Sequence, residues 1–200
     1  MLTDDIAAAR EYDAAIEDTV YEDEELTGFD LTRQEFTGVR FLRCRFDGCT
    51  MHKAAFYDCT FEQCDISRCN ISESYLRRCT LSGVTGVNAD FSRSILRESQ
   101  LTGCTLRYLN LTDCKLEACT FSSCNLADAF LSNIKHKKLK LNGCDLTRAD
   151  FFRTLLRGID LSSCQISGIA LSDDRHEIAG AKISSAQAVD VALMLGVKIV

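Results

Sequence analysis

Cysteine is the residue type with the greatest capacity for chemistry in this 200-residue sequence, which contains twelve of them. Their spacing is regular, because residues 59 to 72 read CTFEQCDISRCNIS, with three cysteines five residues apart. Thiolates bind zinc and oxidised thiols form disulfides, so a metal site and a disulfide framework both need consideration. The twelve positions are Cys44, Cys49, Cys59, Cys64, Cys69, Cys79, Cys104, Cys114, Cys119, Cys124, Cys144 and Cys164.

The pattern argues against both kinds of site. Zinc needs four ligands that converge on one point, commonly as paired CxxC spacings, and the sequence has no CxxC or HxxxH pair. A disulfide scaffold would place its cysteines to suit the bridges, whereas all twelve occupy the same position of a five-residue register. We therefore expect reduced, buried thiols that serve as small apolar residues, and neither a metal nor a cofactor.

Catalytic residues are not indicated. The three histidines, His52, His136 and His176, are far apart in sequence, and no nucleophile motif, phosphate-binding loop or carboxylate pair stands out. The sequence therefore predicts a protein that is not an enzyme.

The register itself defines the fold. From Leu26 to Leu171 every fifth residue is Leu, Ile, Phe or Met at 28 of 30 positions, the exceptions being Gly86 and His136. Five residues advance about 500° around a helix, and an odd period cannot stay on one face of a flat strand. A short extended segment followed by a corner satisfies the period.

The other positions locate that corner. If the apolar residue is position i, the cysteines lie at i−2, where other repeats have Ala, Ser or Val, and eight of the eleven glycines lie at i+2. In an extended segment i−2 and i point inward while i−1 and i+1 point outward. Glycine at i+2 suits a turn with unusual backbone angles. Stacked coils of such units form a β-solenoid with parallel strands about 4.8 Å apart.

Runs such as CNLAD (124–128), CDLTR (144–148) and ADFFR (149–153) resemble the pentapeptide repeat family. The resemblance covers about residues 26–171 and implies an all-β fold, a right-handed quadrilateral β-helix with four pentapeptides per coil. We assign residues 26–173 to this solenoid, with about seven coils and a length of roughly 34 Å. Residues twenty apart would then stack, and Cys44, Cys64, Cys104, Cys124, Cys144 and Cys164 would form one inward column with Val84 in the gap.

The two ends depart from the repeat. Residues 1–25 are an acidic segment in which Thr3 is expected to cap a short helix that can cover the open end of the solenoid. In residues 174–200, Ser184 or Ser185 is expected to begin a helix that runs to about Leu195 and ends at Gly196, followed by the short strand VKIV.

The expected C-terminal helix is apolar almost all round, which favours burial against a second subunit. This tail also resembles the ends of Qnr-type quinolone-resistance proteins within the family, in which a QA…LG(I/V) helix and the last coil form an end-to-end dimer. The resemblance implies a homodimer through the C-terminal end. The expected interface residues are Val189, Ala192, Leu193, Leu195 and Val197.

The two exceptions to the register mark candidate interaction sites. Gly86 and His136 both preserve the five-residue count, so each belongs either to a distorted side of a coil or to a looped-out pentapeptide, and both alternatives stay open for residues 82–90 and 132–140. The residues considered as interaction loops are Gly86, Lys135, His136, Lys137 and Lys138. Basic residues gather on the side of the coil that contains His136.

Charge and hydropathy limit the class of protein. The net charge is −6, but residues 1–30 carry eleven Asp or Glu against one base, whereas residues 31–171 carry 19 bases against 14 acids. No apolar stretch approaches a membrane span, and the acidic N-terminus is unlike a signal peptide. We expect a cytoplasmic location and neither a membrane nor a nucleic acid as direct partner.

The resemblance to Qnr-like proteins implies a function. Those bacterial proteins are dimeric rods that imitate duplex DNA, bind type II topoisomerases and protect them from quinolones or toxins. For this chain the expectation is DNA mimicry, with DNA gyrase or topoisomerase IV as partner. The alternative is a generic protein-interaction scaffold with an unrelated partner.

Overall fold

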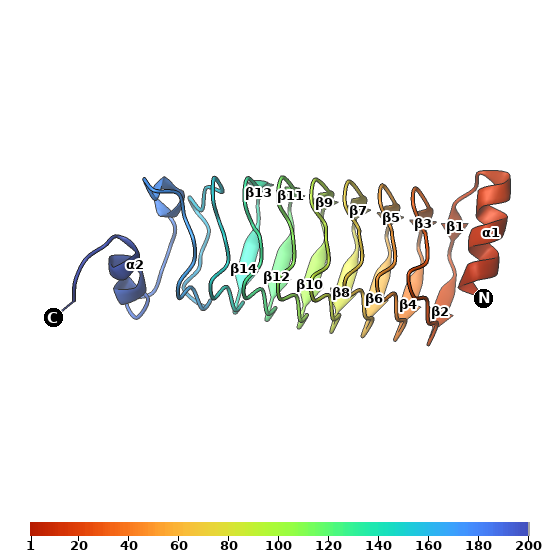
Figure 1. Ribbon diagram of the computed structural model, residues 1–200, viewed down its shortest axis with the longest axis horizontal. Coiled ribbons are helices and arrows are strands. Elements are labelled where there is room, and N and C mark those ends of the chain that lie inside the picture. The colour runs from red at the N-terminus through yellow and green to blue at the C-terminus, as the bar shows by residue number, and fades with distance from the viewer. Residues whose placement is uncertain (200) are drawn as a thin grey trace.

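Each five-residue unit forms one side of a square coil, and the coils stack into a straight rod (Figure 1). The computed structural model describes residues 1–199. Val200, which ends the expected VKIV strand and the 174–200 segment, lies outside the described residues.

Two parallel sheets of seven strands cover two sides of the rod. The odd sheet contains β1 (Ile16–Glu17), β3 (Glu35–Thr37), β5 (Ala55–Tyr57), β7 (Tyr75–Arg77), β9 (Ile95–Arg97), β11 (Lys115–Glu117) and β13 (Lys135–Lys137). The even sheet contains β2 (Val20–Glu22), β4 (Arg40–Leu42), β6 (Thr60–Glu62), β8 (Thr80–Ser82), β10 (Gln100–Thr102), β12 (Thr120–Ser122) and β14 (Lys140–Asn142).

The register between coils is twenty residues on all four sides. Phe36 pairs with Phe56 in the odd sheet and Phe41 with Phe61 in the even sheet. The other two sides are joined by single bridges such as Asp65 to Thr85. The expected four-sided β-helix is therefore confirmed, although its first coil begins at Ile16 rather than at Leu26.

The corners fall at the position where glycine is frequent. Gly38 has a φ of 66°, and the equivalent Arg43 has a φ of 50°, so the left-handed conformation is imposed at this position whether or not the residue is glycine. The amide of Gly38 donates to the carbonyl of Tyr57 in the next coil at 2.8 Å, and Arg43 donates likewise to Glu62. Hydrogen bonding between coils thus maintains a conformation that side chains otherwise disfavour.

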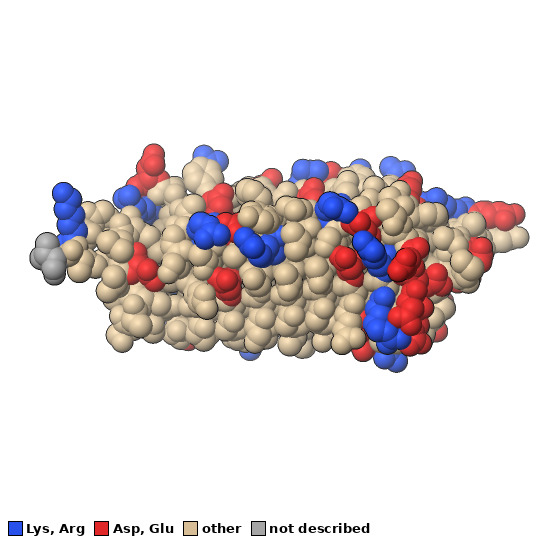
Figure 2. Space-filling view, turned by 60° about the horizontal axis from the view of Figure 1, so that its bottom comes forward, with Lys and Arg blue, Asp and Glu red and all other residues tan. Residues whose placement is uncertain are grey.

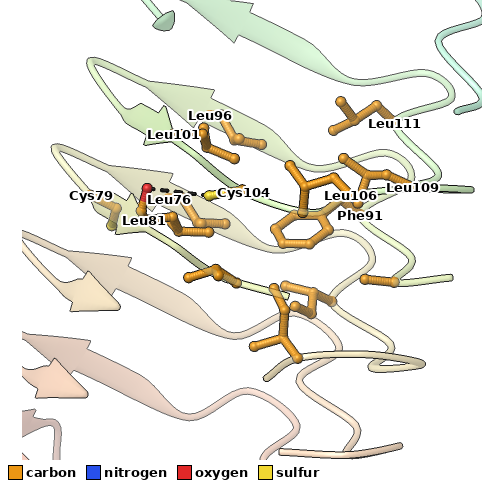
Figure 3. Close-up of a cluster of buried hydrophobic side chains, with 14 of the residues drawn as sticks. Leu76, Cys79, Leu81, Phe91, Leu96, Leu101, Cys104, Leu106, Leu109 and Leu111 are labelled. Atoms are coloured by element: carbon orange, nitrogen blue, oxygen red, sulfur yellow. Dashed lines mark hydrogen bonds between the residues drawn. The ribbon is translucent and has the colours of Figure 1, made fainter. Parts of the chain in front are cut away.

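The core consists of the inward positions i and i−2. At the N-terminal end phenylalanines fill position i, and the rings of Phe41 and Phe61 stack with centroids 4.7 Å apart. Toward the middle of the rod leucines replace them, as Figure 3 shows for Leu76, Leu81, Leu96 and Leu101. Thiols at i−2 fill the space between these side chains.

Helix α1 (Leu2–Tyr12) lies across the N-terminal end of the rod (Figure 1). It buries Leu2, Ile6 and Ala9, so the first coil does not present an open apolar end. The helix begins one residue before Thr3, which is therefore not the expected cap, because the N-cap position is Met1.

The C-terminal segment adds a short 3₁₀ turn, η1 (His176–Ile178), and helix α2 (Ala188–Met194). The helix is shorter than expected, since its N-cap is Gln187 rather than Ser184 or Ser185. The Gln187 side chain is buried and donates to the carbonyls of Leu161 and Cys164 at the open end of the last coil. Residues 197–199 form no strand, contrary to the expectation for VKIV.

Candidate interaction surfaces

All twelve cysteines are buried and free, and each has a hydrogen-bonding role. Every thiol lies 2.6 to 3.4 Å from the carbonyl oxygen of the residue 23 positions earlier, which is the central apolar residue of the coil before it. Figure 3 shows this bond from Cys104 to Leu81. Ser74 and Ser94 make the equivalent bond with their hydroxyl groups. The thiols and these two hydroxyl groups at position i−2 therefore bond to the coil before them, whereas the repeats with Ala or Val at this position lack the bond.

Burial also disfavours the thiolate form. Desolvation raises the pKa of Cys69 and of Cys114 to about 12, so these thiols remain protonated at neutral pH. In contrast, side-chain hydrogen bonds from Cys64, Cys79 and Cys124 lower the pKa of Cys44, Cys59 and Cys104, respectively. Thiolate is the form that attacks disulfides and binds metals. The cysteines therefore belong to the interior of the rod and leave its function to the outer surface.

Gly86 does not mark a loop. Residues 82–90 keep the regular coil, with the bridge from Asp65 to Thr85 on one side and from Asp90 to Asn110 on the other. A Cβ atom at Gly86 would lie 3.0 Å from Leu106 Cδ2 and 3.1 Å from Ile66 Cγ1. The side chains of the coils above and below fill the space that a residue here would occupy.

His136 does not mark a loop either, because Lys135, His136 and Lys137 form β13. The histidine is only half-buried, and its Nε2 hydrogen-bonds to the carbonyl of Leu155 in the next coil. Its neighbours Lys135, Lys137 and Lys138 are exposed. The basic cluster is thus part of a flat sheet face.

Both sheets end at the coil that contains β13 and β14, although the solenoid continues on its other two sides. β13 and β14 are the last strands of their sheets, whereas single bridges still join Asp145 to Gln165 and Asp150 to Ala170. The amide of Leu161 instead donates to Lys182, in the segment before α2. The backbone of the last coil therefore pairs on these sides with the C-terminal segment, although the thiol of Cys164 still donates to Leu141 of β14.

Acidic and basic side chains are distributed unevenly along the rod. In the N-terminal half most bases pair with an acid about one coil away, as in the Arg43–Asp23 and Arg78–Asp58 pairs at 2.8 and 2.5 Å. The outward residues of β8, β10 and β12 are uncharged, namely Thr80, Ser82, Gln100, Thr102, Thr120 and Ser122. Figure 2 shows charged side chains crowded near the N-terminal end and a long uncharged band along the lower half of the view.

The N-terminal end is the most acidic part of the molecule. Eleven acids fall within residues 1–30, and exposed Glu17, Asp18 and Glu25 form no ion pair with another described residue. Others are engaged, since Asp5 accepts a hydrogen bond from Tyr21 at 2.7 Å, an interaction that together with burial raises the tyrosine pKa. This end therefore has a negative surface over α1 and the first coil.

The C-terminal end exposes apolar side chains. Leu193 is 55% exposed, and Val189, Leu195 and Val197 are each 52% exposed, whereas Ala192 is half-buried. The opposite face of α2 packs on the core through Val191 and Met194. Four of the five residues expected at a dimer interface thus lie on the surface, and Ile199, 52% exposed, lies beyond them.

Asp174, His176 and Glu177 form the one group of potential metal ligands found among the described residues, with ligand atoms within 4.8 Å of one another. Each is already engaged. Asp174 accepts from the Ser172 hydroxyl and from His176 Nδ1, and buried Glu177 accepts from the amides of Arg153 and Ser172 at 2.9 and 3.2 Å. This arrangement fixes the turn that contains η1, and we assign no metal to it.

The same contacts predict a pH dependence for this turn. The hydrogen bond to Asp174 raises the pKa of His176 above 6.5, while Ser172 and His176 lower the pKa of Asp174 from 3.8 to about 2. The His176 contribution to stability is complete below pH 6.5 and lost as the pH rises through the raised pKa, whereas that of Asp174 is lost as the pH falls toward 2. An NMR titration of the His176 ring checks this, and Asp174→Asn should return its pKa toward 6.5. An unchanged His176 pKa in that variant would contradict the contact.

Comparison with protein families then identifies the fold class by sequence. A model described as pentapeptide repeat region matches residues 54–131, and one described as pentapeptide repeats (8 copies) matches residues 137–173. The chain belongs to the pentapeptide repeat family. A comparison of this pentapeptide repeat protein with curated proteins found no match.

Solved pentapeptide repeat structures share the fold of this protein. A trypsin-treated variant of QnrB1, a plasmid-mediated fluoroquinolone resistance protein, is 17% identical, with 91% of this chain and 100% of that chain covered and a TM-score of 0.57. A second trypsin-treated QnrB1 variant is 16% identical, with 90% of this chain and 99% of that chain covered and the same TM-score. At this identity the likeness shows the fold alone.

Two features of this pentapeptide repeat protein were missed by sequence reasoning. One is the role of Gln187, which appeared in the sequence only as part of the QA tail pattern. The other is the donor function of position i−2, which the shared use of Cys, Ser and Thr at that position could have indicated. Thr154, for example, donates to Leu131 at 2.6 Å.

Proposed function

We propose that this pentapeptide repeat protein is a non-enzymatic bacterial protein that dimerises through its C-terminal end and binds a type II topoisomerase, DNA gyrase or topoisomerase IV, in the cytoplasm. The observation that carries the proposal is the polarity of the rod, with an acidic end over α1 and an apolar end at α2. None of the helices among residues 1–199 has the length and apolarity needed to cross a bilayer.

The shape supports DNA mimicry. The bridged side of the rod runs over eight layers from Glu25 to Gln165, and its seven spacings of about 4.8 Å give a length of roughly 34 Å. Two such rods joined at α2 span about two turns of duplex at about 3.4 Å per base step. Such a dimer would carry its two acidic ends outermost. Exposed carboxylates there would replace DNA phosphates on a basic enzyme surface. QnrB1, which shares the fold, is a fluoroquinolone resistance protein.

A supercoiling assay tests the proposal. In a reaction with purified gyrase and ciprofloxacin, the protein at micromolar concentration should restore supercoiling. In a reaction without the drug, the protein should instead inhibit supercoiling, because it competes with DNA for gyrase. Either result supports the proposal. If the protein changes neither reaction at a micromolar concentration of dimer, this result would contradict topoisomerase binding.

A variant in α2 links the assay to the dimer. Leu193→Glu should shift the protein from dimer to monomer in light scattering and weaken its effect on gyrase, because a charge would be buried at the interface. Leu155→Glu is the matched control, since Leu155 is 52% exposed on the side of the rod. Monomeric wild-type protein, or an equal effect of both substitutions, would rule out the α2 interface.

One observation favours the second candidate, an interaction scaffold for an unrelated partner. The repeats are not acidic along their length, because residues 31–171 carry 19 bases against 14 acids. A protein with no effect on gyrase would be assigned to this class, and the basic residues on its odd sheet would then be the surface to investigate.

A further inference from the structure

Four bases without an acidic partner lie together on the C-terminal part of the odd sheet. Many other bases pair with an acid about one coil away, as in the Arg148–Asp128 pair at 2.7 Å, although Arg33, Arg77 and Lys140 also form no ion pair with another described residue. The basic patch, defined here as Lys115, Lys135, Lys137 and Lys138, is exposed and forms no ion pair with any other residue in the range 1–199. These four lysines lie on β11, on β13 and at the corner that follows β13.

The pairing of the strands places like charges together. Lys115 and Lys135 are direct partners across β11 and β13, an arrangement that destabilises a sheet. Lys137 is the partner of Glu117, but the Glu117 carboxylate pairs with Arg97 at 3.2 Å instead. The patch thus lowers the stability of the free protein, as residues that serve binding commonly do.

A shallow hollow lies between the two outward rows of side chains. It has a volume of about 230 Å³. Its lining residues are Ile95, Arg97, Lys115, Leu116, Glu117, Lys135, His136 and Lys137. Further toward the N-terminus the same sheet presents half-buried Tyr57 and Tyr75, whose ring centroids are 5.6 Å apart. Aromatic side chains and arginine are enriched in protein interfaces.

We propose that the basic patch and its hollow bind an acidic segment of a partner protein. Carboxylates of the segment pair with Lys115, Lys135, Lys137 and Lys138, and an apolar side chain packs beside Ile95 toward Tyr75. This surface is separate from α1 and from α2, so the proposal does not depend on topoisomerase binding or on the dimer.

The observations favour a polypeptide over a nucleic acid. Nucleic-acid affinity grows with the number of phosphates that bases neutralise, and four lysines on adjacent strands provide few such contacts. Glu117 lies within the hollow and would repel a phosphate chain, whose charges recur at every nucleotide. An acidic peptide can place its carboxylates on the lysines and direct uncharged residues toward Glu117.

Fluorescence anisotropy with the full-length protein tests the proposal. The probe is a short labelled peptide rich in Glu with one central Phe, compared with the same peptide containing Gln in place of Glu and with labelled single-stranded and duplex DNA. The Glu peptide should bind, more weakly as salt rises, and Lys115→Glu/Lys135→Glu should reduce its affinity by about tenfold or more. The control variant is Arg33→Glu/Lys182→Glu, which makes the same change in net charge away from the patch. At a salt concentration that screens long-range attraction, its affinity for the Glu peptide should stay within about twofold of wild type.

A stability measurement keeps the test independent of folding defects. Lys135→Glu alone places an acid opposite Lys115, so its thermal midpoint should rise while its affinity for the Glu peptide falls. Tighter binding of either DNA than of the Glu peptide would overturn the proposal in favour of a nucleic acid. Equal binding of the Glu and Gln peptides, no binding of the Glu peptide, or unchanged affinity of the double variant would also overturn it.

Discussion

Phe41→Ala is expected to lower the free energy of unfolding by about 3–5 kcal/mol, a typical cost of removing a buried phenylalanine ring. Phe41 is 1% exposed and lies at the centre of an aromatic cluster. Its ring contacts Tyr21, Phe36, Phe46 and Phe61 at centroid distances of 5.7, 5.6, 5.4 and 4.7 Å. The strands on both sides hold these neighbours in register, so the cavity has little freedom to collapse.

Chemical denaturation followed by circular dichroism measures this effect. Phe130→Ala is the matched control, because Phe130 is 48% exposed on an outward position and should cost well under half as much. Similar losses for the two variants would show that the aromatic cluster does not have the expected stabilising role.

Gly86→Leu is expected to destabilise the protein by about 1–3 kcal/mol although it restores the residue type of the repeat. A Cβ atom at this position would already approach Leu106 and Ile66 to 3.0 and 3.1 Å, so a leucine would displace both side chains. The substitution therefore overpacks the core, because the side chains of Ile66 and Leu106 already fill the space beside Gly86. Thermal or chemical unfolding measures the loss.

A size-compensating pair separates overpacking from other effects of losing glycine. Ile66→Ala alone creates a cavity and should also destabilise, but Ile66→Ala/Gly86→Leu should be more stable than the sum of the two single changes predicts. Additive losses would contradict the packing explanation. The backbone at Gly86 has no positive φ, so strain of the turn is not a competing cause.

The five-residue period was sufficient to predict the coil and the inward position of the cysteines, and the family resemblance supplied its four sides. The inward positions follow from the alternation of inward and outward residues, which is local. The end of both sheets at β13 and β14 was not predictable, because Lys135–Lys137 keep the period and the change depends on the last coil pairing with residues 177–182. Residues 177–182 lie outside the five-residue repeat, so the period does not predict this pairing.

The candidate surfaces were predicted less well. The helix is shorter than the one expected from Ser184 or Ser185, and the bonds of the Gln187 side chain at its start to Leu161 and Cys164 depend on a coil more than twenty residues earlier. For the residues around His136 the sequence leaves open a distorted side of a coil or a looped-out pentapeptide, and in the structure Lys135, His136 and Lys137 form a strand. A base is neutralised when an acid about twenty residues away lies beside it on an adjacent coil. The register between the coils therefore determines which bases form ion pairs.

The backward direction of the thiol bonds has a consequence for assembly during synthesis. Each inward thiol donates to a carbonyl 23 residues earlier, so a coil that emerges during synthesis finds its acceptors already in place, whereas a later coil cannot organise an earlier one through these bonds. Helix α1 is made first and can seal the starting coil before the next is complete. These thiol bonds therefore favour addition of coils in the order of synthesis, whereas the corner amides of Gly38 and Arg43, which donate forward to Tyr57 and Glu62, are satisfied only once the next coil has formed.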